Sequence, residues 1–192
     1  MKITVGIPDA SRGEAAALYW DAFGKKLGFT MGPKYRALIY INRVMRSDHG
    51  ICAHDDHGRL IGVAGFKTSN GALVGGTFTD IRKVYGWVGA VIRVWLMGTL
   101  ENDVENERFL MDGLFVAREA RGKGVGTALL DEISAEAKRR GYRQVRLDVV
   151  DTNPRARALY LHEGFRELET HKLGLLRYIF GFNSATVMVR DV

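Results

Sequence analysis

The spacing of apolar and polar side chains gives a regular order of elements in the first half of the chain. Residues 2–7 alternate between the two classes, which predicts a strand. Apolar residues recur at helical spacing over 12–26 and 37–45, so we expect a helix in each range. Residues 51–54 and 60–67 are apolar runs on either side of a polar turn, which predicts a β-hairpin. The first half should therefore fold as a strand, two helices and a hairpin.

The second half has a clearer pattern. Strands are expected at 108–117 and 143–150, with a helix at 124–140 between them. Because a strand–helix–strand unit forms a right-handed crossover, the two strands should lie parallel and adjacent in one sheet. The remaining expected elements are a helix at 153–163 and closing strands at 165–170 and 185–190. Since no linker, repeat or low-complexity segment interrupts this order, we expect one domain over residues 1–192.

An apolar stretch at 84–100 has no place in that order. Glycines and Arg93 interrupt it, and it is too short to predict a membrane span. A buried helix or a subunit contact is expected there, with the wall of a binding pocket as an alternative. The apolar residues at 173–182 are a second candidate for such a wall. Apolar surfaces of this kind also fit a homodimer.

Composition and charge narrow the classes of partner. Hydrophobic residues make up 46% and charged residues 26% of the chain, which is typical of a globular protein and excludes a disordered or fibrous one. The formal net charge of +6 favours an anionic partner, such as a phosphorylated cofactor, a nucleic acid or an acidic surface. Basic residues cluster between 138 and 157 with few aromatic residues among them. A solvated helix face beside a phosphate ligand is therefore favoured over single-strand nucleic-acid binding.

Cysteine, histidine and the N-terminal residues indicate the chemical setting. Cys52 is the one cysteine, so it cannot form an internal disulfide, and it lacks the paired spacing of a zinc site. The first residues lack the apolar run of a secretory signal. We therefore expect a reducing, cytoplasmic setting. The five histidines show no metal-ligand spacing, and we expect no metal.

The most informative segment is a glycine cluster at the start of the 124–140 helix. Gly122, Gly124 and Gly126 alternate with other residues, and Arg121 and Lys123 add positive charge. Glycine removes the Cβ atom that would hold a phosphate away, and the N–H groups and dipole of a helix N-terminus favour negative charge. A plain capping turn is the alternative, but it does not require three alternate glycines beside two cations. The cluster therefore predicts a site for a pyrophosphate group.

The spacing of this cluster excludes two other phosphate-binding motifs. In a P-loop the lysine is followed by serine or threonine, whereas Lys123 is followed by Gly124. In the dinucleotide-binding fingerprint two residues separate the last glycines, whereas only Val125 separates Gly124 from Gly126. The cluster therefore fits neither of these two phosphate-binding motifs.

At Arg121, Gly124 and Gly126 the sequence resembles the GNAT superfamily of N-acetyltransferases, whose signature is Gln or Arg, two residues, Gly, one residue, then Gly or Ala. The segment NPRARALYLHEGF at 153–165 is similar to a second feature of the family. The resemblance is strong over 108–168 and compatible in element order elsewhere. It implies an α/β (α+β) fold with a mixed, strongly bent central sheet, whose splayed parallel fourth and fifth strands are flanked by helices.

The resemblance also implies where acetyl-coenzyme A (acetyl-CoA) binds. The donor would lie between the strands at 109–117 and 143–150, within a C-terminal half of about 108–192, and the acceptor side would be a half of about 1–107. The stretch at 84–100 departs from the family pattern. The residues expected to contact acetyl-CoA are Leu114, Phe115, Val116, Arg121, Gly122, Lys123, Gly124, Val125, Gly126, Thr127, Asn153, Ala156 and Tyr160.

Acetylation of an amine calls for a base, an oxyanion donor and an acid. An amine attacks only when neutral, yet a lysine amine has a pKa of about 10.4, so a proton must be removed. Asp112 is the candidate base because it alternates with Leu114 and Val116 on one strand face, with a structural or solvent-facing carboxylate as the alternative. A backbone N–H near Val116 would be the oxyanion donor, and Tyr160 the acid for a leaving thiol with a pKa of about 8.5. Weaker candidates for the base are Asp148 and Glu107.

The predicted function is acetyl-CoA-dependent N-acetylation of a primary amine by direct attack in a ternary complex. No covalent enzyme intermediate is expected, because Cys52 lies outside the matched motifs. A non-catalytic acyl-CoA-sensing module is one alternative, and a basic nucleic-acid-binding protein is a less favoured one. The sequence leaves open whether the acceptor is a small amine, an amino acid, an antibiotic or a protein.

Overall fold

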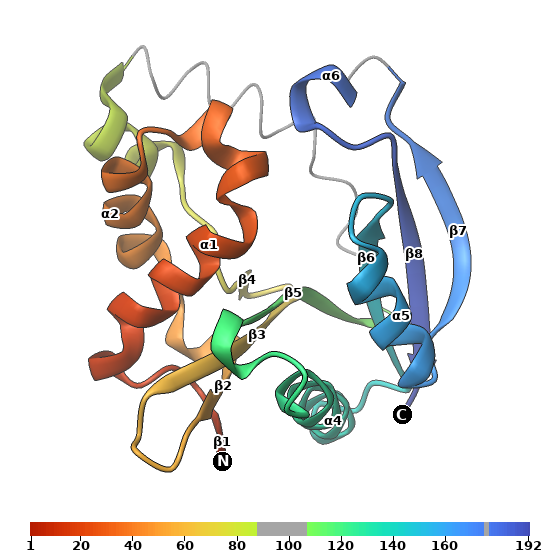
Figure 1. Ribbon diagram of the computed structural model, residues 1–192. Helices are drawn as coiled ribbons and strands as arrows, with labels where there is room; N and C mark the ends of the chain where they lie inside the picture. Colours follow the sequence, from red (N-terminus) through yellow and green to blue (C-terminus); the bar gives the residue numbers. More distant parts are fainter. Residues whose placement is uncertain (88–106, 175–176) are drawn as a thin grey trace.

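The computed structural model describes residues 1–87, 107–174 and 177–192, and their strands form one mixed sheet (Figure 1). The strands lie in the order β1-β2-β3-β5-β6-β8-β7, and the short β4 pairs with β3. All neighbours are antiparallel except β5 and β6, which are parallel. The strand bounds are β1 Lys2–Val5, β2 Gly50–His54, β3 Leu60–Thr68, β4 Gly71–Ala72, β5 Phe109–Val116, β6 Gln144–Val150, β7 Arg166–Lys172 and β8 Ser184–Asp191.

Helices cover both faces of this sheet. Figure 1 shows α1 and α2 on one face, and α4 and α5 on the other. Residues 78–87 are also helical. The helix bounds are α1 Arg12–Met31, α2 Lys34–Val44, α4 Val125–Arg139, α5 Pro154–His162 and α6 Arg177–Phe180, and the short 3-10 turns are η1 Asp9–Ser11, η2 Ser47–His49 and η3 Arg118–Ala120.

Two apolar cores form where these helices meet the sheet. Leu129 and Ile133 of α4 are fully buried one turn apart, and they pack in the core on the α4–α5 face. Tyr40 and Ile41 of α2 are buried in the core on the α1–α2 face. Burial of each large apolar side chain contributes about 1.5–3 kcal/mol, so both helix pairs are held firmly to the strands between them.

The predicted element order is confirmed, with small differences at the boundaries. The helix expected at 12–26 continues to Met31, and the helix expected at 37–45 begins at Lys34. The polar first turn of α2 carries no apolar periodicity, so the pattern could not show it. The fourth and fifth strands of the expected fold are β5 and β6 here, because the two-residue β4 precedes them.

The apolar stretch at 84–100, where a buried helix or a subunit contact was expected, lies largely outside the described residues. Its described part belongs to the helix at 78–87, where the Tyr85 hydroxyl donates a 2.5 Å hydrogen bond to the Met31 carbonyl. This bond joins the end of α1 to that helix. Over the described ranges, we find no helix with the length and apolar character that a bilayer crossing requires.

Candidate functional site

The two parallel strands separate after a short contact. β5 pairs with β6 only through Phe109 with Val145 and Leu110 with Arg146. The other edge of β5 stays paired with β3 as far as Val116. The rest of β5 therefore presents one edge to a gap in the sheet, which confirms the splayed geometry expected from the resemblance.

Backbone groups of alternate residues point into this gap. The N–H of Ala117 donates to the Ile61 carbonyl of β3 at 2.9 Å. Because alternate residues of a strand bond to the same neighbour, Phe115 also faces β3, while Leu114 and Val116 face the gap. The Val116 carbonyl accepts a 3.1 Å bond from Arg121 Nε. Of the three strand residues expected to contact the donor, two thus face the gap and Phe115 does not.

The glycine turn joins the end of β5 to the N-terminus of α4. Gly122 and Gly124 have φ values of +76° and +78°, and a Cβ at either position would meet nothing within 4 Å. Their backbone conformation therefore favours glycine, and the space beside them is open. A Cβ at Gly126 would lie 3.0 Å from Leu159 Cδ2, so this glycine allows α5 to approach α4. The sequence predicted phosphate binding at all three glycines, with a plain capping turn as the alternative, and did not predict this packing role of Gly126.

The first turn of α4 is suited to an anion. Gly124 is its N-cap residue and supplies no side-chain acceptor, so the first N–H groups of the helix, from Val125 onward, are not capped by that residue. Arg121 and Lys123 are exposed beside them. Unfilled donors, the helix dipole and two cations together favour a phosphate group at this point.

A polar clasp ties the start of α4 to the end of α5. Thr127 Oγ1 donates a 2.7 Å hydrogen bond to Glu163 Oε1, which lowers the pKa of that carboxyl. Arg190 of β8 donates from Nη1 to the Glu163 carbonyl at 2.9 Å and from Nη2 to the Leu130 carbonyl at 3.0 Å. Sequence reasoning missed Glu163 and Arg190, because no motif contains them as a pair. The clasp fixes the spacing between the glycine turn and α5.

Tyr160 lies on α5 and belongs to the apolar core on the α4–α5 face. Its side chain is buried, its ring centroid is 5.8 Å from that of Phe165, and burial raises the pKa of its hydroxyl to about 12. Asn153 caps the same helix, since its side-chain oxygen accepts a 3.3 Å bond from the Ala156 N–H and Pro154 follows it. Asn153 thus has a structural role as a helix cap, in addition to the donor contact expected for it.

Asp112 lies on the opposite face of the sheet because β5 contains a bulge. Consecutive residues of β3 pair with Met111 and Gly113, so Asp112 between them has no partner. A bulge reverses the alternation of a strand. Leu114 and Val116 therefore pack toward α4, and the expectation that Asp112 shares a face with them is wrong.

Asp112 opens into a cavity of about 540 Å³ on the α1–α2 side. The carboxyl is exposed to the cavity while protein surrounds it elsewhere. The loss of water on the protein side of the carboxyl raises its pKa, and the electrostatic effects of the nearby Lys67 and His49 side chains oppose the rise. Asp112 in turn contributes to a raised pKa of Tyr19, which is mainly due to burial. The residues that line the cavity are Arg46, Lys67, Gly71, Ala72, Val74, Gly75, Gly76, Thr77, Leu110, Met111, Asp112 and Asp148.

The two weaker candidates for the base lie in different places. Asp148 of β6 lines the same cavity and is ion-paired with Arg146 at 3.4 Å. Glu107 is exposed before β5 and does not line it. The cavity thus brings together Asp112 and Asp148, and leaves Glu107 outside.

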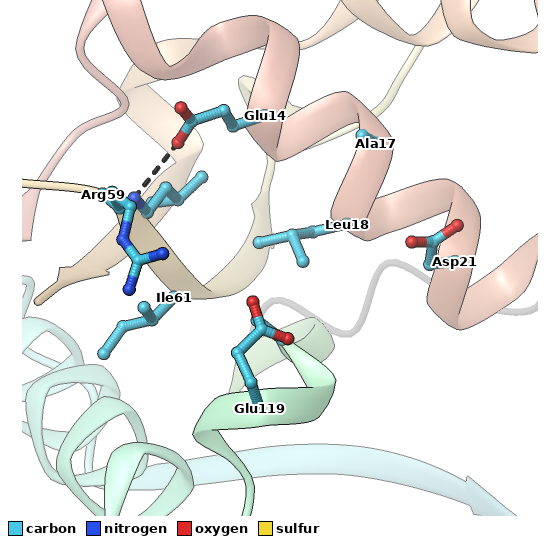
Figure 2. Close-up of a pocket in the computed structure, with 9 residues that line it drawn as sticks. Glu14, Ala17, Leu18, Asp21, Arg59, Ile61 and Glu119 are labelled. Atoms are coloured by element: carbon cyan, nitrogen blue, oxygen red, sulfur yellow. Dashed lines mark hydrogen bonds between the residues drawn. The ribbon is translucent and has the colours of Figure 1, made fainter.

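A second cavity of about 240 Å³ lies between α1, β3 and η3 (Figure 2). Glu14 and Asp21 come from α1 and Glu119 from η3. Glu14 accepts a 3.1 Å bond from the Leu60 N–H, and Arg59 is paired with Asp55. The three carboxylates of Glu14, Asp21 and Glu119 disfavour the binding of a phosphate in this second cavity. Within the described residues no group of histidine, cysteine, aspartate or glutamate could hold a metal ion.

These features agree with one known family. The sequence model of the acetyltransferase (GNAT) family matches residues 14–165. The chain belongs to the GNAT family of acetyltransferases. The matched range contains the glycine turn, the gap, the bulge and α5. As a GNAT acetyltransferase, the protein is an acyltransferase of a family that uses acetyl-CoA.

Solved structures support the GNAT fold. An N-acetyltransferase from Staphylococcus aureus Mu50 is 14% identical with a TM-score of 0.70, over 99% of this chain and 100% of that one. A ribosomal-protein-alanine N-acetyltransferase from Brucella melitensis is 18% identical with a TM-score of 0.63, over 100% of both chains. A GNAT superfamily phosphinothricin acetyltransferase from Sinorhizobium meliloti, in complex with AcCoA, is 15% identical with a TM-score of 0.63, over 100% of this chain and 88% of that one. Among proteins with curated descriptions, none matches this sequence.

Proposed function

We propose that this GNAT acetyltransferase moves the acetyl group directly to a primary amine, with donor and acceptor approaching from opposite faces of the sheet. The gap between β5 and β6 carries this proposal. On one face it adjoins the glycine turn and α5, and on the other it adjoins the cavity at Asp112. Acetyl-CoA supplies an activated thioester, and a thioester held in the gap is accessible to an amine in the cavity.

The donor side binds mainly through backbone. The glycine turn and the first N–H groups of α4 would hold the pyrophosphate, with Arg121 and Lys123 adding charge. The gap-facing groups of Leu114 and Val116 would pair with the amide groups of the pantetheine arm. The Val116 N–H would then donate to the thioester oxygen as negative charge develops there.

The acceptor side supplies a base. Because the surrounding protein raises the pKa of Asp112, its carboxylate is a stronger base than that of an ordinary aspartate. A protonated amine that enters the cavity would give up its proton to Asp112 directly or through one water. The neutral amine would then attack the acetyl carbon in the gap.

Tyr160 acts on the departing sulfur. Because burial raises its pKa to about 12, the hydroxyl stays protonated at neutral pH and can donate a hydrogen bond. The same rise makes full proton transfer to a thiolate with a pKa of about 8.5 less favourable than from an ordinary tyrosine. Its main contribution is therefore a hydrogen bond to the leaving sulfur as the carbon–sulfur bond breaks. The second proton that the nitrogen loses on forming the amide would neutralise the thiolate.

Thermal unfolding with and without acetyl-CoA tests the donor site, and two glycine variants make a matched pair. Gly124 and Gly141 lie at opposite ends of α4, have φ values of +78° and +81°, and face open space. Replacing either with alanine should cost about 1–2 kcal/mol of stability through backbone strain. At 100 times its dissociation constant, acetyl-CoA should stabilise the wild type and Gly141→Ala by about 2.7 kcal/mol. Gly124→Ala should lose most of this effect.

Release of free thiol in the presence of amines then separates the functions. Stabilisation by acetyl-CoA together with thiol release in the presence of an amine would identify an acetyltransferase. Stabilisation without release from any amine would indicate an acyl-CoA-sensing module. Equal responses of the two alanine variants would place the donor elsewhere, and no stabilisation of the wild type would remove the proposal.

A further inference from the structure

The charged residues around the Asp112 cavity are not equally available to a ligand. Arg46 Nη2 contacts Asp48 Oδ2 at 2.8 Å, and Arg46 also donates to the Asn70 carbonyl. Asp148 is paired with Arg146 at 3.4 Å. Neither Asp48 nor Arg146 lines the cavity. The charges of Arg46 and Asp148 are therefore partly neutralised by partners outside it.

Lys67 and Asp112 are the two remaining charges of the lining. Over the described residues, neither takes part in an ion pair, with each other or with a third group. Lys67 of β3 pairs with Leu110 of β5, and Asp112 is two residues farther along β5. Diagonal neighbours of this kind lie about 7–8 Å apart on one face of a sheet. The cavity therefore presents one cation and one anion side by side.

From this arrangement we infer that the acceptor is a small zwitterion, with its amine at Asp112 and a carboxylate next to the amine at Lys67. The inference rests on the proposed function and names the substrate class of that site. A cavity of about 540 Å³ is in the size range of small-molecule sites. Gly75 and Gly76 also line it and add no side chain that could fill the space between the two charges. A lysine side chain of a protein would bring the amine without the adjacent carboxylate.

The test compares acceptors that differ in one charge. Thiol release is measured with a panel of α-amino acids, each beside its carboxamide, for the wild type, Lys67→Met and Lys138→Met. Lys138 is exposed near the end of α4 and serves as the matched control. The wild type should prefer the best acid over its carboxamide by about tenfold or more in kcat/KM, as a charge-assisted bond implies. Lys67→Met should reduce kcat/KM for the acid by a similar factor, mainly through KM.

The carboxamide and the control give the outcomes that overturn the inference. On the plateau of each pH–rate profile, where the shift that Lys67 causes in the pKa of Asp112 no longer affects the rate, activity with the carboxamide should change less than about twofold in Lys67→Met. Lys138→Met should match the wild type with both acceptors. Equal use of acid and carboxamide by the wild type overturns the inference, as does an equal loss with both in Lys67→Met. Stabilisation by acetyl-CoA without acetyl transfer to any α-amino acid of the panel overturns it too, and leaves the proposed donor site unaffected. Absence of that stabilisation would show that the proposed function itself fails.

Discussion

The two faces of the sheet at the β5–β6 gap are built in different ways. On the proposed donor face, the glycine turn and the start of α4 are one continuous segment, and their main groups are backbone N–H donors. On the proposed acceptor face, Lys67, Asp112 and Asp148 come from three strands and line the cavity. A site made of backbone is insensitive to most side-chain changes, whereas one made of side chains is not. Acceptor choice should therefore be altered by substitutions that leave donor binding intact.

The largest effect should come from Asp112→Asn, which separates the two faces most sharply. If Asp112 is the base, the variant should lose about 10²- to 10⁴-fold in kcat, since general bases contribute in that range. Stabilisation by acetyl-CoA should be unchanged. The acidic limb of the pH–rate profile, which follows the raised pKa of Asp112 in the wild type, should disappear. A variant with wild-type rates and an unchanged profile would exclude Asp112 as the base.

The stability of the same variant provides the folding control. A carboxyl whose folded pKa is raised binds its proton more tightly in the folded protein than in the unfolded chain. Its contribution to stability therefore falls as pH rises from the unfolded pKa of about 3.9 through the raised folded value. Asp112→Asn removes this loss, so it should be at least as stable as the wild type at pH 8. Lower stability at pH 8 would point to a structural role.

Tyr160→Phe should have the next largest effect, on chemistry at the donor side. Loss of one hydrogen bond to a developing thiolate should lower kcat by about ten- to a hundredfold. Because the pKa of Tyr160 is about 12, the shape of the pH–rate profile below pH 10 should not change. The measurement is kcat across that range. A basic limb that vanishes in the variant would show that the hydroxyl transfers its proton at lower pH than its burial allows.

The smallest effect should come from the clasp between α4 and α5. Thr127→Val removes the donor to Glu163 at nearly constant volume, whereas Thr127→Ser keeps the hydroxyl. The valine variant should lose about 1 kcal/mol, or about 2–4 °C in Tm for a domain of this size. The serine variant should retain most of that stability. If the clasp also sets the distance between the glycine turn and α5, Thr127→Val should raise KM for acetyl-CoA several-fold. Equal stability and equal KM in the valine and serine variants would show that the hydrogen bond to Glu163 contributes nothing.

The same contrast between faces explains what could be read from the sequence. The glycine turn was predictable because its chemistry is local: the two glycines that adopt positive φ and the two neighbouring cations all lie within residues 121–124. Asn153 followed by Pro154 was readable as a helix cap for the same reason. Element order followed from hydrophobic spacing.

The rest depends on contacts between distant residues. The face on which Asp112 lies was mistaken because a bulge leaves no mark in the alternation of apolar residues before the pairing with β3 is known. Lys67 was not considered, since only the register of β3 against β5 brings it beside Asp112. The contact between Glu163 and Arg190 could not be predicted, because it depends on how β8 packs beside the end of α5.

The bulge at Asp112 also bears on how this enzyme could change over evolutionary time. A residue without a partner on β3 can be exchanged without a matching change in the neighbouring strand. The ladder and both cores are maintained by the residues around it. Substitutions at position 112 should therefore cost the fold little, so the chemistry proposed for the cavity can diverge faster than the fold around it.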